Sequence, residues 1–255
     1  KVKLSANYAN ERNRFTDAVE GAAIGFDPTQ PIRVEGAPYG GFFEYTSGVD
    51  ANGNYPLIAI AARNPVAQLL QTNDRGKSNR LFGNFEIDYK FHFLPSLRAV
   101  VNLGFDESNG ERRRLVGANA GSAPSNNNIP FGTDEYSEST RRNKLIDAYF
   151  VYNKSFNDFN VELTGGHSYQ KFESNRFDTG NILNPDLPST CRVIAVNTDV
   201  VLLGFFGRSN INFKNKYLLT LYYRRDGSSR FEKESRWGNF PSAAFAWKIK
   251  EDFFK

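Results

Sequence analysis

Apolar and polar residues alternate along several stretches of this chain, a pattern typical of β-strands with one apolar and one polar face. The clearest stretch runs from Leu81 to Phe93, where Phe85, Ile87 and Tyr89 alternate with polar and charged residues. Helical periodicity is nearly absent. The alternation predicts about eight antiparallel strands, each close to the ~10 residues that a tilted membrane strand needs. The predicted strands cover residues 2–8, 81–93, 97–106, 148–152, 161–169, 203–214, 217–224 and 243–249.

The connections between these strands alternate between short and long. Short turns are expected around 94–96, 156–159 and 215–216, and long polar stretches cover 16–78, 110–142, 174–198 and 228–236. This order places all long loops at one end of the sheet, as in outer-membrane barrels with short periplasmic turns and long extracellular loops. Aromatic residues gather at the short-turn end, where they predict a girdle at the membrane interface. These residues are Phe91, Phe93, Tyr152, Phe156, Phe159, Phe213, Tyr217, Trp247, Phe253 and Phe254.

A soluble antiparallel sandwich or barrel also alternates, with its apolar faces turned inward. Soluble barrels rarely carry such long loops at one end only, and they have no reason to band aromatic residues at their turns. The sequence therefore favours an all-β, antiparallel transmembrane β-barrel section. With 23 Phe and 12 Tyr residues the chain is not disordered, and its single Cys excludes an internal disulfide framework.

The net charge of +4 does not indicate a nucleic-acid partner, because basic and acidic residues are interleaved along the chain. The densest basic clusters are Arg112–Arg114 and Arg141–Arg142. Both lie in stretches that the pattern predicts to be free of strands. We expect no nucleic-acid binding.

Several short motifs occur in a fixed order along the chain. They read NPVA at residues 64–67, ND at 73–74, DYKF at 88–91, KYLLT at 216–220, RRDGSSRF at 224–231 and RWGNFPS at 236–242. This series resembles the barrel of SusC/RagA-type TonB-dependent transporters of Bacteroidetes. The positions that carry the C-terminal part of the resemblance are Arg225, Asp226, Gly227, Ser228, Ser229, Arg230, Phe231, Trp237, Gly238, Phe240 and Pro241.

The resemblance implies a barrel of about 22 strands around an N-terminal plug in the outer membrane. It also implies import of a glycan or peptide, energy supplied by the TonB complex through the plug, and a SusD-like surface lipoprotein over the extracellular loops. The chain starts at Lys1 inside an expected strand, so we expect residues 1–255 to be a middle section of one barrel domain. The plug and the TonB box are then expected outside it. A small structural or adhesive barrel and a soluble carbohydrate-binding β domain remain alternatives.

Charged residues on the polar faces of the expected strands are candidates for the lining of the lumen. These are Glu86, Asp88, Lys90, Arg98, Arg208, Arg224 and Asp226. Arg224 and Asp226 share a face, so a pairing across the lumen is expected to brace the wall against the plug, or one part of the wall against another, rather than to contact substrate. Gly227, Ser228 and Ser229 are expected to end a strand, with Trp237 and Phe240 packing at the start of the next.

No catalytic, metal or cofactor site is expected. Cys191 is predicted in a long outer loop, His92 near a short turn and His167 on an apolar face, so the three cannot meet as a nucleophile with its base. Two His and one Cys supply no zinc spacing. Asp134 and Glu135 are interpreted as part of a solvated loop rather than as calcium ligands. The chain is expected not to be an enzyme.

Overall fold

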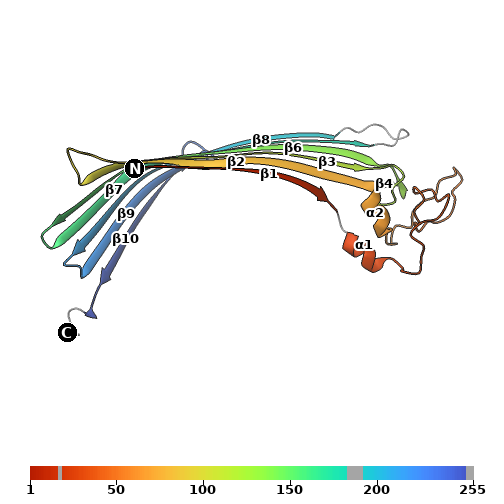
Figure 1. Ribbon diagram of the computed structural model, residues 1–255, viewed down its shortest axis with the longest axis horizontal. Coiled ribbons are helices and arrows are strands. Elements are labelled where there is room, and N and C mark those ends of the chain that lie inside the picture. The colour runs from red at the N-terminus through yellow and green to blue at the C-terminus, as the bar shows by residue number, and fades with distance from the viewer. Residues whose placement is uncertain (17–18, 183–191, 251–255) are drawn as a thin grey trace.

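The computed structural model of the chain describes residues 1–16, 19–182 and 192–250. Eight long strands form one antiparallel sheet in the order β1-β2-β3-β6-β7-β8-β9-β10 (Figure 1). The predicted number of strands is confirmed. The elements are β1 (Val2–Phe15), α1 (Val19–Gly25), α2 (Pro65–Gln71), β2 (Thr72–Lys90), β3 (Leu97–Val116), β4 (Ser125–Asn126), β5 (Ile129–Pro130), β6 (Thr133–Phe156), β7 (Phe159–Ile182), β8 (Arg192–Phe213), β9 (Tyr217–Ser228) and β10 (Trp237–Trp247).

The strands are much longer than the alternation predicts. β6 and β7 each have 24 residues, which at about 3.3 Å per residue gives a length of ~80 Å. The prediction of loops is wrong for residues 72–78, 110–116, 133–142, 174–182 and 192–198, which are strand. Both basic clusters, Arg112–Arg114 and Arg141–Arg142, therefore lie in β3 and β6. These outer strand ends carry polar residues on both faces, so they lose the period-two pattern while their backbone groups remain paired with neighbouring strands.

The three short turns lie where they are predicted, at 91–96, 157–158 and 214–216. Asn157, Lys214 and Asn215 have φ values of 49°, 51° and 57°. This left-handed conformation is the one that two-residue hairpin turns require, and asparagine adopts it more readily than most residues. The tight turns thus join β6 to β7 and β8 to β9 without splaying the strands.

The sheet is bent, and the residues between β1 and β2 lie on its concave side (Figure 1). Arg114 of β3 lines a cavity together with Gln68 and Leu69 of these residues, so its face is the concave one. The apolar residues have the opposite parity along the strands and therefore lie on the convex face. Strand pairing places Leu4, Phe85, Leu103, Ile146, Tyr169 and Leu203 in one row across six strands. The convex face is open: Leu4 is 72% exposed and Phe245 is 65% exposed. The predicted aromatic residues lie at its short-turn end, where the rings of Phe159 and Phe213 are 4.4 Å apart. Phe253 and Phe254 lie outside the described residues.

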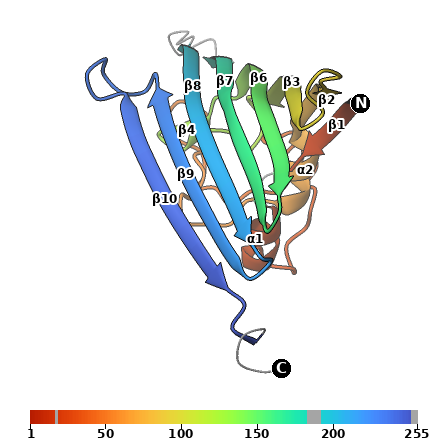
Figure 2. The same ribbon diagram turned by 90° about the vertical axis from the view of Figure 1, so that its left-hand side faces the viewer.

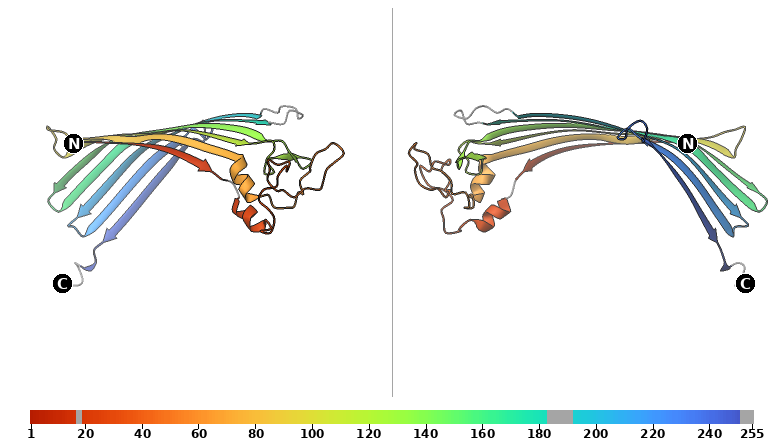
Figure 3. Two further views of the ribbon diagram at one scale, coloured as in Figure 1. Left: turned by 45° about the vertical axis from the view of Figure 1, so that its right-hand side comes forward. Right: turned by 180° about the vertical axis from the view of Figure 1, so that it is seen from behind.

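The residues between β1 and β2 form a folded unit rather than a plain polar loop. It contains α1 and α2 and lies on the concave side of the outer strand ends (Figures 1 and 3). Tyr39, Phe42, Leu57 and Ala67 are buried in it. The backbone N–H of Leu57 donates to the carbonyl oxygen of Asn128, which joins this unit to the loop that contains β4 and β5. Viewed along the sheet, the unit lies behind β6 to β10 (Figure 2).

The helices of the described residues are short. None of them is long and apolar enough to cross a membrane.

Candidate functional site

The charged candidates from the sequence share one face of the sheet. Strand pairing connects Asp88 through Val100, Tyr149, Gly166 and Phe206 to Arg224. Each of the other candidates lies an even number of positions along its strand from a member of this row, so it points to the same side of the sheet. The residues on the concave face are therefore Glu86, Asp88, Lys90, Arg98, Arg208, Arg224 and Asp226. The polar half of each predicted strand thus contributes to one continuous surface.

Ion pairs fix many of these charges in place. Arg98 Nη1 lies 3.0 Å from Asp88 Oδ2, and Arg208 Nη2 lies 3.1 Å from Glu162 Oε1. Both arginine side chains are close to half exposed, so each pair adds at most about 1 kcal/mol to stability. Their main effect is to hold charges of both signs at fixed positions along the wall.

Arg224 and Asp226 form the predicted ion pair, but along their own strand rather than across the concavity. Arg224 Nε lies 2.7 Å from Asp226 Oδ1. Gly204 and Gly238 are the register partners of Asp226 on the two neighbouring strands. A Cβ atom at Gly204 would clash with the Asp226 carboxylate. Gly204 therefore leaves room for this pair on the concave face, whereas a Cβ at Gly238 would meet the Phe240 ring.

The serines of the RRDGSSRF motif join β9 to its neighbours at the outer end of the strand. The Ser228 N–H donates to the carbonyl oxygen of Arg236 at 3.0 Å, which closes the loop between β9 and β10. Ser229 exchanges two hydrogen bonds with Val201 of β8, donating from its own N–H at 2.9 Å and accepting at its Oγ at 2.8 Å. The predicted end of the strand at this motif is confirmed, since β9 ends at Ser228.

The NPVA motif forms the start of α2. Asn64 is fully buried, and its Oδ1 accepts from the N–H groups of Val66 and Ala67 at 3.1 and 3.2 Å. Its Nδ2 donates to the carbonyl oxygens of Ile32 and Phe43. Asparagine is a favoured N-cap residue, and proline suits the first helical position because it needs no hydrogen-bond acceptor there. The order of an N-cap asparagine and a proline is the signal in the sequence that predicts this helix start.

Glu44 is a buried carboxyl group beside this cap. Its side chain is 7% exposed, and its Oε1 accepts from the Asn64 N–H at 3.2 Å. Burial raises the pKa of Glu44 from 4.5 to about 6, and the hydrogen bond from the Asn64 backbone and the charge of Arg63 only partly oppose that rise. The sequence gives no signal for this site, because Glu44 lies in a stretch without periodicity.

Glu44→Gln is expected to remove a pH dependence from the folded unit formed by residues 19–71. Because the folded-state pKa of Glu44 is raised, the folded unit binds the proton more tightly than the unfolded one. Its free energy of unfolding is therefore expected to fall by about 2 kcal/mol as pH rises from 4.5 through about 6. Hydrogen exchange of the amides in 39–71, measured from pH 4 to 8, tests this. The exposed Glu35→Gln serves as control, and a wild-type profile that is flat across this range would contradict the assignment.

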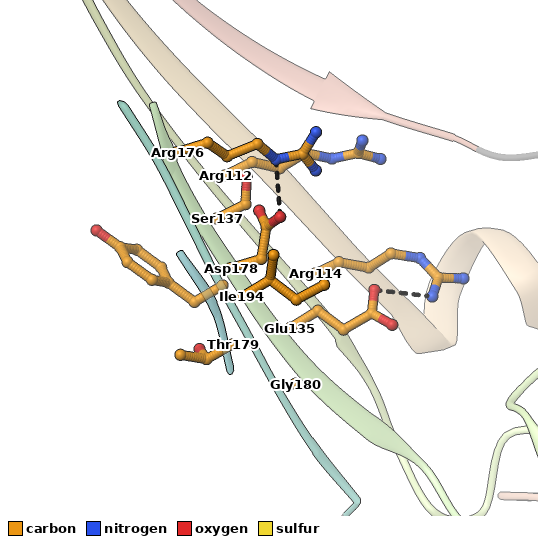
Figure 4. A pocket seen from close by; sticks show the side chains of 10 residues that line it. Arg112, Arg114, Glu135, Ser137, Arg176, Asp178, Thr179, Gly180 and Ile194 are labelled. Atoms are coloured by element: carbon orange, nitrogen blue, oxygen red, sulfur yellow. Dashed lines mark ion pairs between the residues drawn. The ribbon is translucent and has the colours of Figure 1, made fainter. Parts of the chain in front are cut away.

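A cavity of about 700 Å³ opens on the concave face between the outer ends of β3, β6, β7 and β8 (Figure 4). Its charged side chains are Arg112, Arg114, Glu135, Arg176 and Asp178. Arg176 Nε lies 2.7 Å from Asp178 Oδ2, and Arg114 Nη1 lies 3.5 Å from Glu135 Oε2. The sequence reasoning missed this cavity because it treated both 110–142 and 174–198 as loops.

Asp74 of the ND motif anchors the edge of this cavity. Its side chain is 1% exposed and accepts two hydrogen bonds from Arg112, with Nε at 2.8 Å and Nη2 at 2.5 Å. Arg114 Nε lies 3.9 Å from the same carboxylate. The buried acid thus positions two arginines of β3, Arg112 over the Phe15 ring of β1 and Arg114 beside α2 of the folded unit.

The residues considered for catalysis or metal binding lie apart. His92 lies at the turn after β2, and His167 lies on the convex face of β7, as predicted. Cys191 lies outside the described residues. Asp134 and Glu135 are in β6 rather than in a loop, and they face opposite sides of the sheet, paired with Arg113 and Arg114. Within the described ranges no three His, Cys, Asp or Glu side chains gather as a metal site.

Known proteins match this chain over its length. The family described as TonB dependent receptor-like, beta-barrel matches residues 8–254. TonB-dependent receptor SusC of Bacteroides thetaiotaomicron is 35% identical over the whole chain, and TonB-dependent receptor P3 of Formosa agariphila is 31% identical over 81% of it. The chain covers 26% and 21% of these two proteins, so it spans about a quarter or less of their length.

Solved structures show the same fold. The RagAB peptide transporter superimposes on all of this chain with a TM-score of 0.68 at 17% sequence identity, and the chain covers 29% of that protein. The convex apolar face, the aromatic band at the short turns and the SusC relationship place the chain in the outer membrane. This chain belongs to the TonB-dependent receptor-like β-barrel family.

Proposed function

We propose that the chain forms eight strands of the barrel wall of an outer-membrane importer, with its concave face lining the lumen. The observation that carries this proposal is the division of one bent sheet into an exposed apolar convex face and a concave face of fixed charges. Only a wall between lipid and water needs both faces in this arrangement. Transport rather than catalysis is its function.

The two alternatives fit the sheet less well. A soluble carbohydrate-binding domain would leave large side chains such as Leu4, Phe150 and Phe245 in water. A complete small barrel would pair its first and last strands. In the described part of the chain β1 and β10 instead form the two open edges of the sheet.

The partners follow from the same proposal. A plug, outside these 255 residues, rests on the concave face and receives energy from the TonB complex. A SusD-like lipoprotein covers the folded unit and the outer loops, and the cargo is a glycan or a peptide. The matched RagAB structure is described as a peptide transporter, which supports the peptide class.

Uptake in cells tests the importer proposal. We expect a strain that lacks the intact protein to lose uptake of either a fluorescent oligosaccharide mixture or a fluorescent peptide mixture. Complementation is expected to restore that uptake only when TonB is present. Uptake that is unchanged by the deletion, or that complementation restores without TonB, would refute the proposal.

Asp226→Ala is expected to loosen the plug without unfolding the barrel. The Arg224–Asp226 pair holds a guanidinium in one orientation on the concave face. Loss of one charge-assisted hydrogen bond to the plug weakens that contact by roughly tenfold. Vancomycin is too large to pass through intact outer-membrane channels, so a loosened plug lets more of it enter. We expect the concentration of vancomycin that inhibits growth to fall about fourfold or more. Asp158→Ala, at the exposed β6–β7 turn, is the control. Equal sensitivity of the two variants to vancomycin would contradict the proposal that the Arg224–Asp226 pair braces the wall against the plug.

A further inference from the structure

The convex face changes from apolar to polar near the outer ends of β9 and β10. Tyr223 and Pro241 face each other in an apolar row, and Arg225 and Asn239 face each other in the next row outward. One row further out, Trp237 stands on β10 and Leu203 on β8. Tryptophan favours the membrane interface, where lipid headgroups lie, so Trp237 indicates that Arg225 is close to that depth.

Arg225 is an exposed cation at this border. Its guanidinium carbon lies 5.1 Å from the centre of the Trp237 ring, and among the described residues no carboxylate forms an ion pair with it. The Trp237 ring lies flat on Gly227, where an added Cβ would come within 3.0 Å of it. A glycine at 227 therefore lets the indole support the guanidinium and leaves the hydrogen-bonding edge of Arg225 open.

Asn239 adds a second donor beside Arg225. Its Oδ1 accepts a hydrogen bond from the Tyr223 hydroxyl at 2.8 Å. This contact orients the amide, so the Asn239 Nδ2 hydrogens remain available to an acceptor. Tyrosine and tryptophan are the residues that favour the membrane interface, and here they hold both donors in place.

An apolar groove leads from these donors toward the centre of the apolar band. Gly165 and Gly207 face each other across β7 and β8, and a Cβ at Gly207 would have no atom within 4 Å. The groove has a volume of about 760 Å³. Its convex-side lining consists of Leu163, Gly207, Ser209, Leu221, Tyr223, Pro241 and Ala243.

His167 lies one row outward from Gly165 and Gly207 on the same face. Its ring stacks on Phe205 with centroids 4.8 Å apart, and its Nδ1–H donates to the carbonyl oxygen of Gly204 at 3.0 Å. This hydrogen bond explains how a histidine occupies the apolar face, because the polar Nδ1 atom is satisfied within the protein. Strand pairing places His167 in one row with Phe205 and Arg225.

We propose that this face of β7 to β10 is a binding site for one anionic, phosphate-bearing lipid. The phosphate binds to Arg225 and Asn239, and one acyl chain lies in the groove over Gly165 and Gly207. The charge argument selects the occupant: a cation without a carboxylate partner stands at headgroup depth, and a phosphate supplies the acceptors that both donors require. The site faces lipid and is independent of the cargo that the lumen carries.

Native mass spectrometry of the intact, delipidated protein tests this site, with phosphatidylglycerol and phosphatidylcholine as the probes. We expect tight retention of one phosphatidylglycerol molecule by the wild type. Arg225→Gln is expected to weaken that binding by about fivefold, and Gly207→Leu to abolish it by filling the groove. Arg113→Gln, an outward-facing arginine already paired with Asp134, is the matched control. Heat-modifiable migration verifies that every variant is folded.

Three results would overturn the proposal. The first is wild-type binding of phosphatidylglycerol by both Arg225→Gln and Gly207→Leu. The second is equal retention of phosphatidylcholine, which would show that the cation does not select an anionic headgroup. The third is displacement of the lipid by millimolar inorganic phosphate, which would show an anion site without an acyl-chain groove.

Discussion

Asn64→Ala is expected to open the folded unit of residues 19–71 while the eight-stranded sheet remains intact. The substitution removes the N-cap of α2 and the side-chain donor to the Phe43 carbonyl oxygen. The Ile32 carbonyl oxygen also loses its bond from Asn64, but it still accepts from the Phe43 N–H. A lost cap costs about 1 kcal/mol, and a carbonyl left unpaired costs about 1 kcal/mol or more, so the free energy of opening is expected to fall by about 2 kcal/mol. Hydrogen exchange of the amides in α2 and in 39–58 measures it.

The matched control for this substitution is Asn52→Ala, at an exposed position of the same unit. Only its backbone N–H takes part in a hydrogen bond, to Asp50. We expect exchange in this variant to stay at the wild-type rate. If Asn64→Ala and Asn52→Ala exchange alike, the cap does not organise the unit.

Asp74→Ala is expected to disorder the outer ends of β2 and β3. Removal of this carboxylate takes away both hydrogen bonds of the Arg112 pair and leaves a guanidinium beside a buried surface. Breaking a buried pair costs about 3–5 kcal/mol, and since Arg112 is 45% exposed the lower end applies. The free energy of opening of residues 72–78 and 110–116, measured by hydrogen exchange of their amides, is expected to fall by about 3 kcal/mol.

Glu111→Ala provides the comparison for Asp74. Glu111 pairs with Lys77 at 3.0 Å on the convex face, and both side chains are exposed. An exposed pair of this kind contributes less than about 1 kcal/mol. Equal protection of the strand ends in the two variants would mean that burial of Asp74 does not stabilise them.

The sequence predicted the strands only where one face meets lipid. From Leu81 to Tyr89 the two faces differ in chemistry, so the alternation is visible. From Arg112 to Arg114 both faces meet water, and basic residues stand at successive positions. A strand of this kind is held by its backbone pairing with β2 and β6, which no side-chain pattern reveals. The error in length has this one physical cause.

Side-chain parity explains why the seven charged candidates lie on one face. Each was selected at a polar position of an alternating strand, and antiparallel pairing carries parity from strand to strand. Parity alone does not predict the cavity bounded by Arg114, Glu135 and Arg176. That prediction also requires the pairing register of the outer strand ends. The 20 consecutive pairs between β3 and β6 start at Val116 and Thr133, on either side of the long connection 117–132, whose sequence does not show where pairing begins. Burial of Glu44 likewise depends on contacts with Asn64, 20 positions away.

The length of the strands beyond the apolar band has a mechanical consequence. About 80 Å of strand, even tilted by about 40°, rises well above a hydrocarbon layer of about 30 Å. Strand pairing from β2 to β8 continues along this projecting wall, so its backbone is held as it is within the membrane. For the importer proposed above, we expect that such a wall does not collapse inward. We expect any gating motion above the membrane to be a hinged movement of a separate body against this rim.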